Sequence, residues 1–117
     1  MKKEQANVDN EAVSVYGGKV GKLEAVFFIE WAGVGNPVEG QYYYPDRGRA
    51  KMYVLKGSNP KNGVLLLDEF TRNANGVLKK SAICRLAKKL TATRIVWEGT
   101  MTNLDGRQLS MSFSRLR

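Results

Sequence analysis

The stretch that most strongly decides the fold is residues 109–114, which read LSMSFS. Its apolar residues, Leu109, Met111 and Phe113, alternate one for one with serines. Successive side chains of a β-strand point to opposite faces, so this period of two places the apolar side chains on one face and the hydroxyl groups on the other. The stretch therefore predicts an antiparallel strand with one buried face and one face in water.

The same alternation recurs upstream, between short segments rich in turn residues. Two further segments each place a set of residues on one face: Leu23, Ala25, Phe27, Ile29 and Trp31, and Ile95, Trp97, Gly99 and Met101. Seven turn signals separate eight such segments: Gly17-Gly18, Gly35–Pro37, Pro45–Gly48, Ser58–Gly63, Asn73–Gly76, Thr91–Thr93 and Asn103–Gly106. Connections this short allow neighbouring strands to pair only as hairpins, which predicts an eight-stranded antiparallel meander.

An eight-stranded meander exposes two sheet edges unless its first and last strands pair. Closure removes both edges, so we predict an all-β protein whose eight-stranded antiparallel up-and-down meander closes into a small barrel. An open β-sandwich would show the same alternation. Residues 12–117 are expected to form this single domain, with residues 1–11 as a flexible N-terminal segment.

Residues 77–90 allow a second interpretation. Leu78, Ala82, Leu86 and Leu90 recur at a spacing of four, with basic residues between them, which is also typical of an amphipathic helix. Against a helix, Asn75-Gly76 is a strong hairpin turn signal directly before the segment. We favour a strand and keep a barrel with one helix at 77–90 as the alternative.

The composition excludes several kinds of chemistry. The 117 residues include one cysteine, Cys84, and no histidine, so neither an internal disulfide nor a histidine-based triad or metal site can form. Asp68 and Glu69 are adjacent on a predicted strand and should point to opposite faces, so they do not form a catalytic pair. We expect no catalytic residue, no metal ligand and no cofactor, and hence a protein that is not an enzyme.

The charge is strongly positive and unevenly distributed. The whole chain carries a formal net charge of +8. Residues 1–78 hold ten Lys and Arg against nine Asp and Glu, a net charge of +1, whereas residues 79–117 hold nine against two, a net charge of +7. This asymmetry favours an anionic partner. The residues that would contact a polyanion are Lys79, Lys80, Arg85, Lys88, Lys89 and Arg94.

A group of tyrosines beside two arginines is the second candidate contact surface. Tyr42 and Tyr44 should share one face of their strand, and Arg47 and Arg49 follow at a hairpin tip. Tyrosine and arginine are enriched among the residues that dominate protein interfaces. We therefore predict that Tyr42, Tyr44, Arg47 and Arg49 contact a protein partner.

Three stretches, followed by the final alternating strand, carry a resemblance to a known group of proteins: Gly40–Tyr44, Leu65–Phe70, and Val96–Thr100 with Asp105-Gly106 after it. In strand type and order, residues 13–115 resemble small bacterial cell-envelope β-barrel domains of calycin-like type, which include avidin-like and lipocalin-like meanders. The resemblance implies an exported bacterial protein that binds something and catalyses nothing.

These observations lead to one preferred function and two alternatives. The preferred function is a non-enzymatic binding or inhibitory module of the bacterial envelope, of the immunity or inhibitor type, whose barrel-mouth loops act on a protein partner with an acidic surface. The alternatives are a basic small-barrel nucleic-acid-binding protein, which the lack of aromatic residues within 79–94 disfavours, and a carrier of a small hydrophobic ligand. No apolar run is long enough to span a membrane. We expect a periplasmic or secreted protein if a leader preceded Met1, and a cytoplasmic one otherwise.

Overall fold

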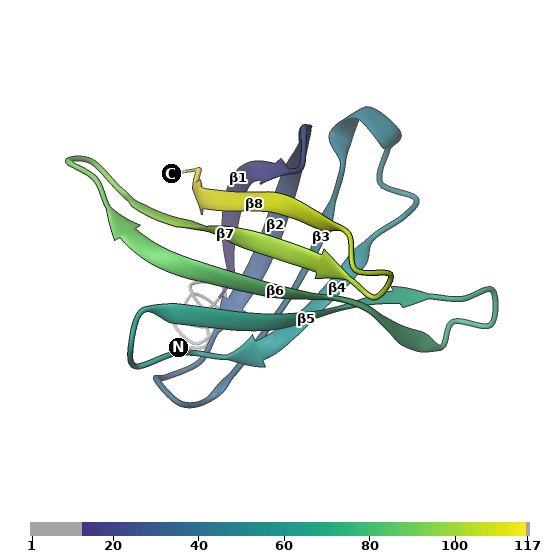
Figure 1. Cartoon of the computed structure of the whole chain (residues 1–117), viewed down its shortest axis with the longest axis horizontal. Coiled ribbons are helices and arrows are strands. Elements are labelled where there is room, and N and C mark those ends of the chain that lie inside the picture. Colours follow the sequence, from purple (N-terminus) through teal and green to yellow (C-terminus); the bar gives the residue numbers. More distant parts are fainter. Residues whose placement is uncertain (1–12, 117) are drawn as a thin grey trace, which may run out of the picture.

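A computed structural model describes residues 13–116, and these form eight antiparallel strands in sequence order (Figure 1). The strands are Val13–Val20 (β1), Leu23–Trp31 (β2), Pro37–Tyr43 (β3), Tyr53–Ser58 (β4), Val64–Arg72 (β5), Leu78–Leu90 (β6), Ile95–Asn103 (β7) and Gln108–Arg115 (β8). One turn of 3₁₀ helix, Pro45–Arg47 (η1), lies in the connection between β3 and β4.

The sheet closes on itself, because β1 pairs with β8 as well as with β2. This last pairing runs antiparallel from Tyr16 opposite Arg115 to Val20 opposite Met111. The prediction of an eight-stranded up-and-down barrel is confirmed, and the open sandwich is wrong. The predicted flexible segment 1–11 lies outside the described residues.

One predicted turn, at Gly17-Gly18, is wrong. Both glycines lie inside β1, and the chain reverses instead at Gly21, whose φ of 63° suits a tight hairpin. Gly18 lies opposite Phe113 on β8, and a Cβ atom placed at Gly18 would overlap the carbonyl oxygen of Ser112. The glycine pair therefore serves barrel closure, because it lets the first and last strands approach closely.

The helix considered for residues 77–90 is also wrong, because β6 covers Leu78–Leu90. Ala82, Cys84 and Leu86 lie at a spacing of two and are all buried, so the burial of alternate residues overrides the helical spacing of the leucines. A bulge interrupts the β5–β6 pairing, since Glu69 pairs with Ala82 but the next residue, Phe70, pairs with Lys80.

The interior is occupied by side chains from all eight strands. The buried cluster consists of Tyr16, Val20, Ala25, Phe27, Ile29, Val38, Tyr42, Leu55, Leu65, Leu67, Ala82, Cys84, Leu86, Trp97, Met101, Met111 and Phe113. Phe27, Ile29, Trp97, Met111 and Phe113 lie on the faces that the alternation predicts, and all five are buried. Trp31, on the same predicted face as Phe27 and Ile29, is only partly buried and packs against the cluster.

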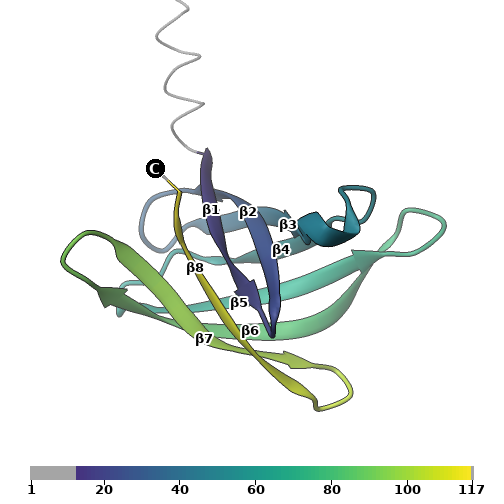
Figure 2. The same ribbon diagram turned by 90° about the horizontal axis from the view of Figure 1, so that it is seen from above.

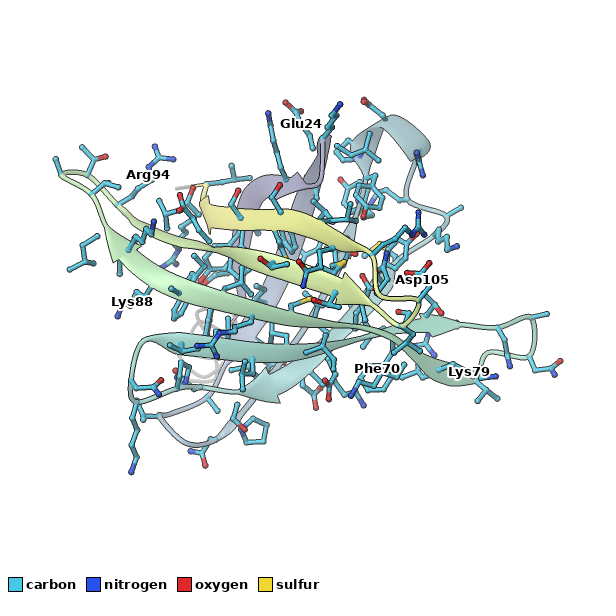
Figure 3. All side chains as sticks on the ribbon, viewed as in Figure 1. Glu24, Phe70, Lys79, Lys88, Arg94 and Asp105 are labelled. Atoms are coloured by element: carbon cyan, nitrogen blue, oxygen red, sulfur yellow. The ribbon has the colours of Figure 1, made fainter. Side chains whose placement is uncertain are left out.

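A meander places its connections alternately at two ends of the barrel, and the β5–β6 and β6–β7 hairpins accordingly point in opposite directions (Figure 2). We call one end the tryptophan end; it holds the β2–β3, β4–β5 and β6–β7 loops and the end of β8. The other is the tyrosine end, with the β1–β2, β3–β4, β5–β6 and β7–β8 loops. Lys88 and Arg94 lie toward the first, and Lys79 and Asp105 toward the second (Figure 3).

Candidate binding site at the tryptophan end

Three aromatic side chains form the floor of the tryptophan end. The rings of Trp31 and Trp97 are stacked, with centroids 5.8 Å apart and planes at 25°. Tyr16 meets Trp31 edge-on at 6.5 Å, and the indole Nε1 of Trp31 donates a 2.7 Å hydrogen bond to the Tyr16 hydroxyl. Because this bond uses the only polar group of the Trp31 ring, Trp31 offers apolar ring surface to whatever lies above it.

Above these rings lies a hollow of about 670 Å³. It is open to solvent and is lined by the three aromatic residues together with Asn59, Thr93 and cationic side chains. Binding sites for small ligands have volumes of roughly 300–1,000 Å³ and combine apolar walls with a few polar groups. The tryptophan end therefore has the size and the surface of a binding site.

Three cations, Lys88, Arg94 and Arg115, line this hollow, and none of its lining residues is acidic. Lys88 lies opposite Trp97 in the β6–β7 register, and Arg115 lies opposite Tyr16 in the β1–β8 register. The ion pairs found within residues 13–116 use other cations: Lys80 with Asp68, Lys89 with Glu98, and Arg107 with Asp105. The hollow thus combines an aromatic floor with positive charge on its walls.

Hydrogen bonds hold the loops around the hollow in place. Asn59, in the β4–β5 loop, donates from Nδ2 to the carbonyl of Ala32 at 2.6 Å, and its backbone exchanges 2.8 Å bonds with Gly35 and Asn36. In the β6–β7 loop, the backbone nitrogen of Thr91 donates to the carbonyl oxygen of Arg94 at 2.9 Å. A site whose rim is already ordered loses less conformational entropy when a ligand binds.

The four residues predicted to contact a partner do not form one surface. Tyr42 is fully buried, so its predicted role as a surface contact is wrong. Tyr44 is half-buried at the tyrosine end, with the exposed Arg47 guanidinium 5.8 Å from its ring centroid. Arg49 lies on the outer face of the barrel, 5.0 Å from the ring centroid of Tyr43. The sequence alternation separates them, because Tyr42 points inward and Tyr43 outward.

The tyrosine end is closed by aromatic packing. Tyr42 stacks on Tyr53 with centroids 4.9 Å apart, and Tyr44 packs edge-on against both rings. Burial, together with the neighbouring charge of Glu69, raises the pKa of Tyr42 far above that of a free tyrosine. Burial also raises the pKa of Tyr44. Both phenols are therefore neutral at physiological pH.

Beneath these rings lies the buried carboxylate of Glu69, which is 4% exposed. It accepts hydrogen bonds from the Tyr42 hydroxyl and, at 2.7 Å, from the Ser81 hydroxyl. Ser81 is the extra residue of the β5–β6 bulge, and a bulge can redirect a side chain that regular pairing would point outward. As predicted, the adjacent Asp68 points the other way and pairs with Lys80 at 3.2 Å.

The lone thiol is also enclosed. Cys84 is fully buried on β6, and burial raises its pKa from 9.0 to about 12. A thiol that stays protonated at neutral pH is a weak nucleophile. Among residues 13–116, no cluster of three or more acidic or cysteine side chains could hold a metal ion.

The six basic residues considered for polyanion binding are dispersed by the barrel. Lys88 and Arg94 line the hollow, whereas Lys79 lies toward the tyrosine end (Figure 3). Lys80 and Lys89 point outward and are paired with Asp68 and Glu98. Lys79 and Lys89 are ten residues apart on one strand, a span of about 33 Å at the strand rise per residue. Only two of the six belong to the candidate site.

Sequence reasoning missed the role of the inward-facing cations, although the pattern contained it. Lys88 follows the core residue Leu86 by two positions, and Arg115 follows the core residue Phe113 by two. The period of two thus places a cation two positions after the last buried side chain in each of these two strands. Because β6 and β8 both run toward the tryptophan end, the two cations meet there.

A groove on the outer face of β2–β5 is a weaker candidate. It contains about 550 Å³ and is lined by Phe28 and Val54 together with acidic and basic side chains, Glu30 and Glu39 against Arg49, Lys56 and Arg72. Opposite charges alternate there, so the groove favours neither an anion nor a cation.

A comparison of the sequence with models of known protein families and with curated proteins finds no significant match. The calycin-like resemblance therefore stays a prediction. Within residues 13–116, which the structure describes, no helix has the length and apolar character needed to cross a membrane.

Proposed function

We propose that the protein is a non-enzymatic binding module that holds an acidic segment of a protein partner at the tryptophan end. The observation that carries this proposal is the combination of Lys88, Arg94 and Arg115 around the stacked Trp31 and Trp97, with no acidic residue lining the hollow. A cationic rim attracts an acidic partner and orients it, while desolvated aromatic rings at the centre provide most of the affinity.

The absence of catalysis is part of the proposal, and two side chains support it. Glu69 and Cys84 are the buried carboxyl and thiol groups of residues 13–116. Both lie in the core, Glu69 beneath the tyrosine rings and Cys84 as a protonated thiol whose pKa is raised to about 12. Neither lines the hollow.

A small organic anion is a second candidate for the same hollow, because its volume of about 670 Å³ lies in the range of small-ligand sites. Core side chains occupy the deeper interior, so such a ligand would lie at the mouth rather than inside the barrel.

Charge reversal at the two ends tests the proposal. A partner captured from the native source is identified and purified, and its affinity is measured by calorimetry. We expect the double substitution Lys88→Glu and Arg94→Glu to weaken binding by at least about tenfold, or 1.4 kcal/mol. Lys22→Glu with Lys79→Glu makes the same change in net charge at the tyrosine end, and should weaken binding less than about twofold.

Equal losses in the two double variants would show that only the overall charge matters, and would contradict the proposal. An unchanged affinity in the Lys88→Glu and Arg94→Glu variant would contradict the proposal as well. The melting temperatures of both variants should stay close to that of the parent protein, because all four lysine and arginine side chains are exposed.

A further inference from the structure

The surface available at the tryptophan end combines the ring of Trp31 with exposed apolar side chains, Ile95 and Leu116, and with the three cations. Trp97 is 7% exposed and Trp31 is partly exposed, and their planes are nearly parallel. Aromatic side chains pair with one another in stacked and edge-on arrangements, and gain about 0.5–1.5 kcal/mol beyond the area they bury. The group that best complements this floor is a further ring.

Charge limits what such a ring can carry. Arg94 makes one long side-chain contact in the described chain, 3.4 Å from Nη1 to the Ser114 hydroxyl. Lys88 and Arg115 line the same hollow, which has no acidic lining residue. A guanidinium binds a carboxylate through two parallel hydrogen bonds, which makes a carboxylate a better match than a neutral polar group. The complementary ligand therefore joins a ring to nearby carboxylates.

We propose that the element entering the hollow is an aromatic side chain of the partner flanked by Asp or Glu in an extended segment. This inference rests on the proposed function and names the chemistry of the segment that is held. The ring lies against Trp31 and Trp97, and the flanking carboxylates bind Lys88, Arg94 and Arg115. The ordered Asn59 and Thr91 loops hold the rim in the binding conformation.

The chain provides its own reporter for this inference. Trp31 and Trp97 are the only two tryptophans of the 117 residues, and both lie in the site. Their fluorescence therefore responds to a ligand that binds in the hollow. A phenylalanine in a peptide does not emit at tryptophan wavelengths, so the signal stays with the protein.

Three acetylated and amidated heptapeptides form the test: Gly-Asp-Glu-Phe-Glu-Asp-Gly, the same peptide with Ala in place of Phe, and a neutral version with Asn and Gln in place of Asp and Glu. We expect the first to change the tryptophan emission saturably, with a dissociation constant below about 1 mM. The Ala peptide and the neutral peptide should both bind at least about tenfold more weakly, and added salt should weaken binding of the Phe peptide. The pair Lys88→Gln and Arg94→Gln should remove the response, whereas Lys22→Gln with Lys79→Gln should keep it.

The other outcomes separate the two proposals. Equal binding of the Phe and Ala peptides would overturn the aromatic inference and leave acid recognition at the mouth intact. Equal binding of the neutral peptide, or no response to any peptide, would overturn both. A free aromatic carboxylate, 3-phenylpropionate, is tested in the same way. If it binds as tightly as the Phe peptide, the hollow is a site for a small molecule, and the proposal of a bound peptide segment is overturned.

Discussion

The two ends of this barrel use the same kind of side chain for opposite purposes. At the tyrosine end, Tyr42, Tyr44 and Tyr53 pack against one another above Glu69, which accepts two hydroxyl hydrogen bonds. At the tryptophan end, Trp31 and Trp97 stack beneath a hollow with three cations on its walls. A closed end stabilises the fold, and an open end leaves surface available for a ligand.

The difference lies in where the polar groups are satisfied. The hydroxyl of Tyr42 donates a hydrogen bond to Glu69, so both polar groups find their partner within the core. At the other end, Lys88 and Arg115 follow the last buried residues of β6 and β8, and both are exposed to water instead. Buried polar groups must be paired, whereas cations at a rim remain free to bind an anion.

The largest expected effect tests whether the tyrosine end is the better packed of the two. Tyr42→Ala removes a fully buried ring that stacks on Phe27 and Tyr53, and should lower the free energy of unfolding by about 3–5 kcal/mol. Trp31→Ala removes a partly exposed ring and should cost only about 1–2 kcal/mol. Urea denaturation of both variants measures the difference, and equal costs would break the comparison.

The loss of stability at high pH gives a second test of the packing at the tyrosine end. The pKa of Tyr42 is raised above that of an unfolded tyrosine, so its contribution is complete below pH 10 and is lost at higher pH, where only the unfolded chain releases the phenol proton. Each such group makes the free energy of unfolding fall by about 1.4 kcal/mol per pH unit. Cys84 contributes in the same way between pH 9 and its folded pKa of about 12.

Urea denaturation from pH 8 to pH 12 measures this slope. Tyr42→Phe should make the decline above pH 10 shallower by one proton, whatever its effect on stability at neutral pH. A variant slope equal to that of the parent protein would mean that Tyr42 ionises in the folded state.

Much of the fold follows from alternation alone, and its exceptions have physical reasons. The alternation that includes Met111 and Phe113 predicts a strand with one face in the core, because a period of two with one apolar face does not fit a helix. Both side chains are buried. The Gly17-Gly18 pair misled because glycine permits both a turn and a close approach of two backbones. Only the β1–β8 pairing tells these apart, and that is a long-range contact.

The site was harder to predict. The alternation puts Tyr42 and Tyr44 on one face of their strand, and both pack on the core, although Tyr44 lies just beyond the end of β3. The sequence does not state which face is buried, and that decides whether a tyrosine packs or binds. In the sequence, Lys88 belongs to a run of basic residues, and nothing connects Arg115 with that run. Their convergence depends on barrel closure, which brings β8 next to β1.

A smaller effect compares one hydroxyl at each end. Ser81→Ala removes a donor to the buried Glu69 carboxylate and should lower the free energy of unfolding by about 1–2 kcal/mol. Thr93→Ala alters an exposed hydroxyl at the hollow and should stay within about 0.5 kcal/mol of the parent protein. Thermal and urea denaturation measure both, and a larger loss for Thr93→Ala would show that the rim is part of the stabilising core.

The central claim is that the tryptophan end is an accessible, positively charged site, and quenching of tryptophan fluorescence by ions tests it without a partner. A cationic rim concentrates anions near the rings and repels cations. Each quenching constant is divided by the constant of the same quencher for free tryptophan. The normalised constant of iodide should be at least about twofold larger than that of acrylamide, and that of caesium smaller. Both differences should shrink at high ionic strength and in the Lys88→Gln and Arg94→Gln variant. Equal normalised quenching by iodide and caesium, or differences that survive in that variant, would contradict a cationic mouth over Trp31 and Trp97.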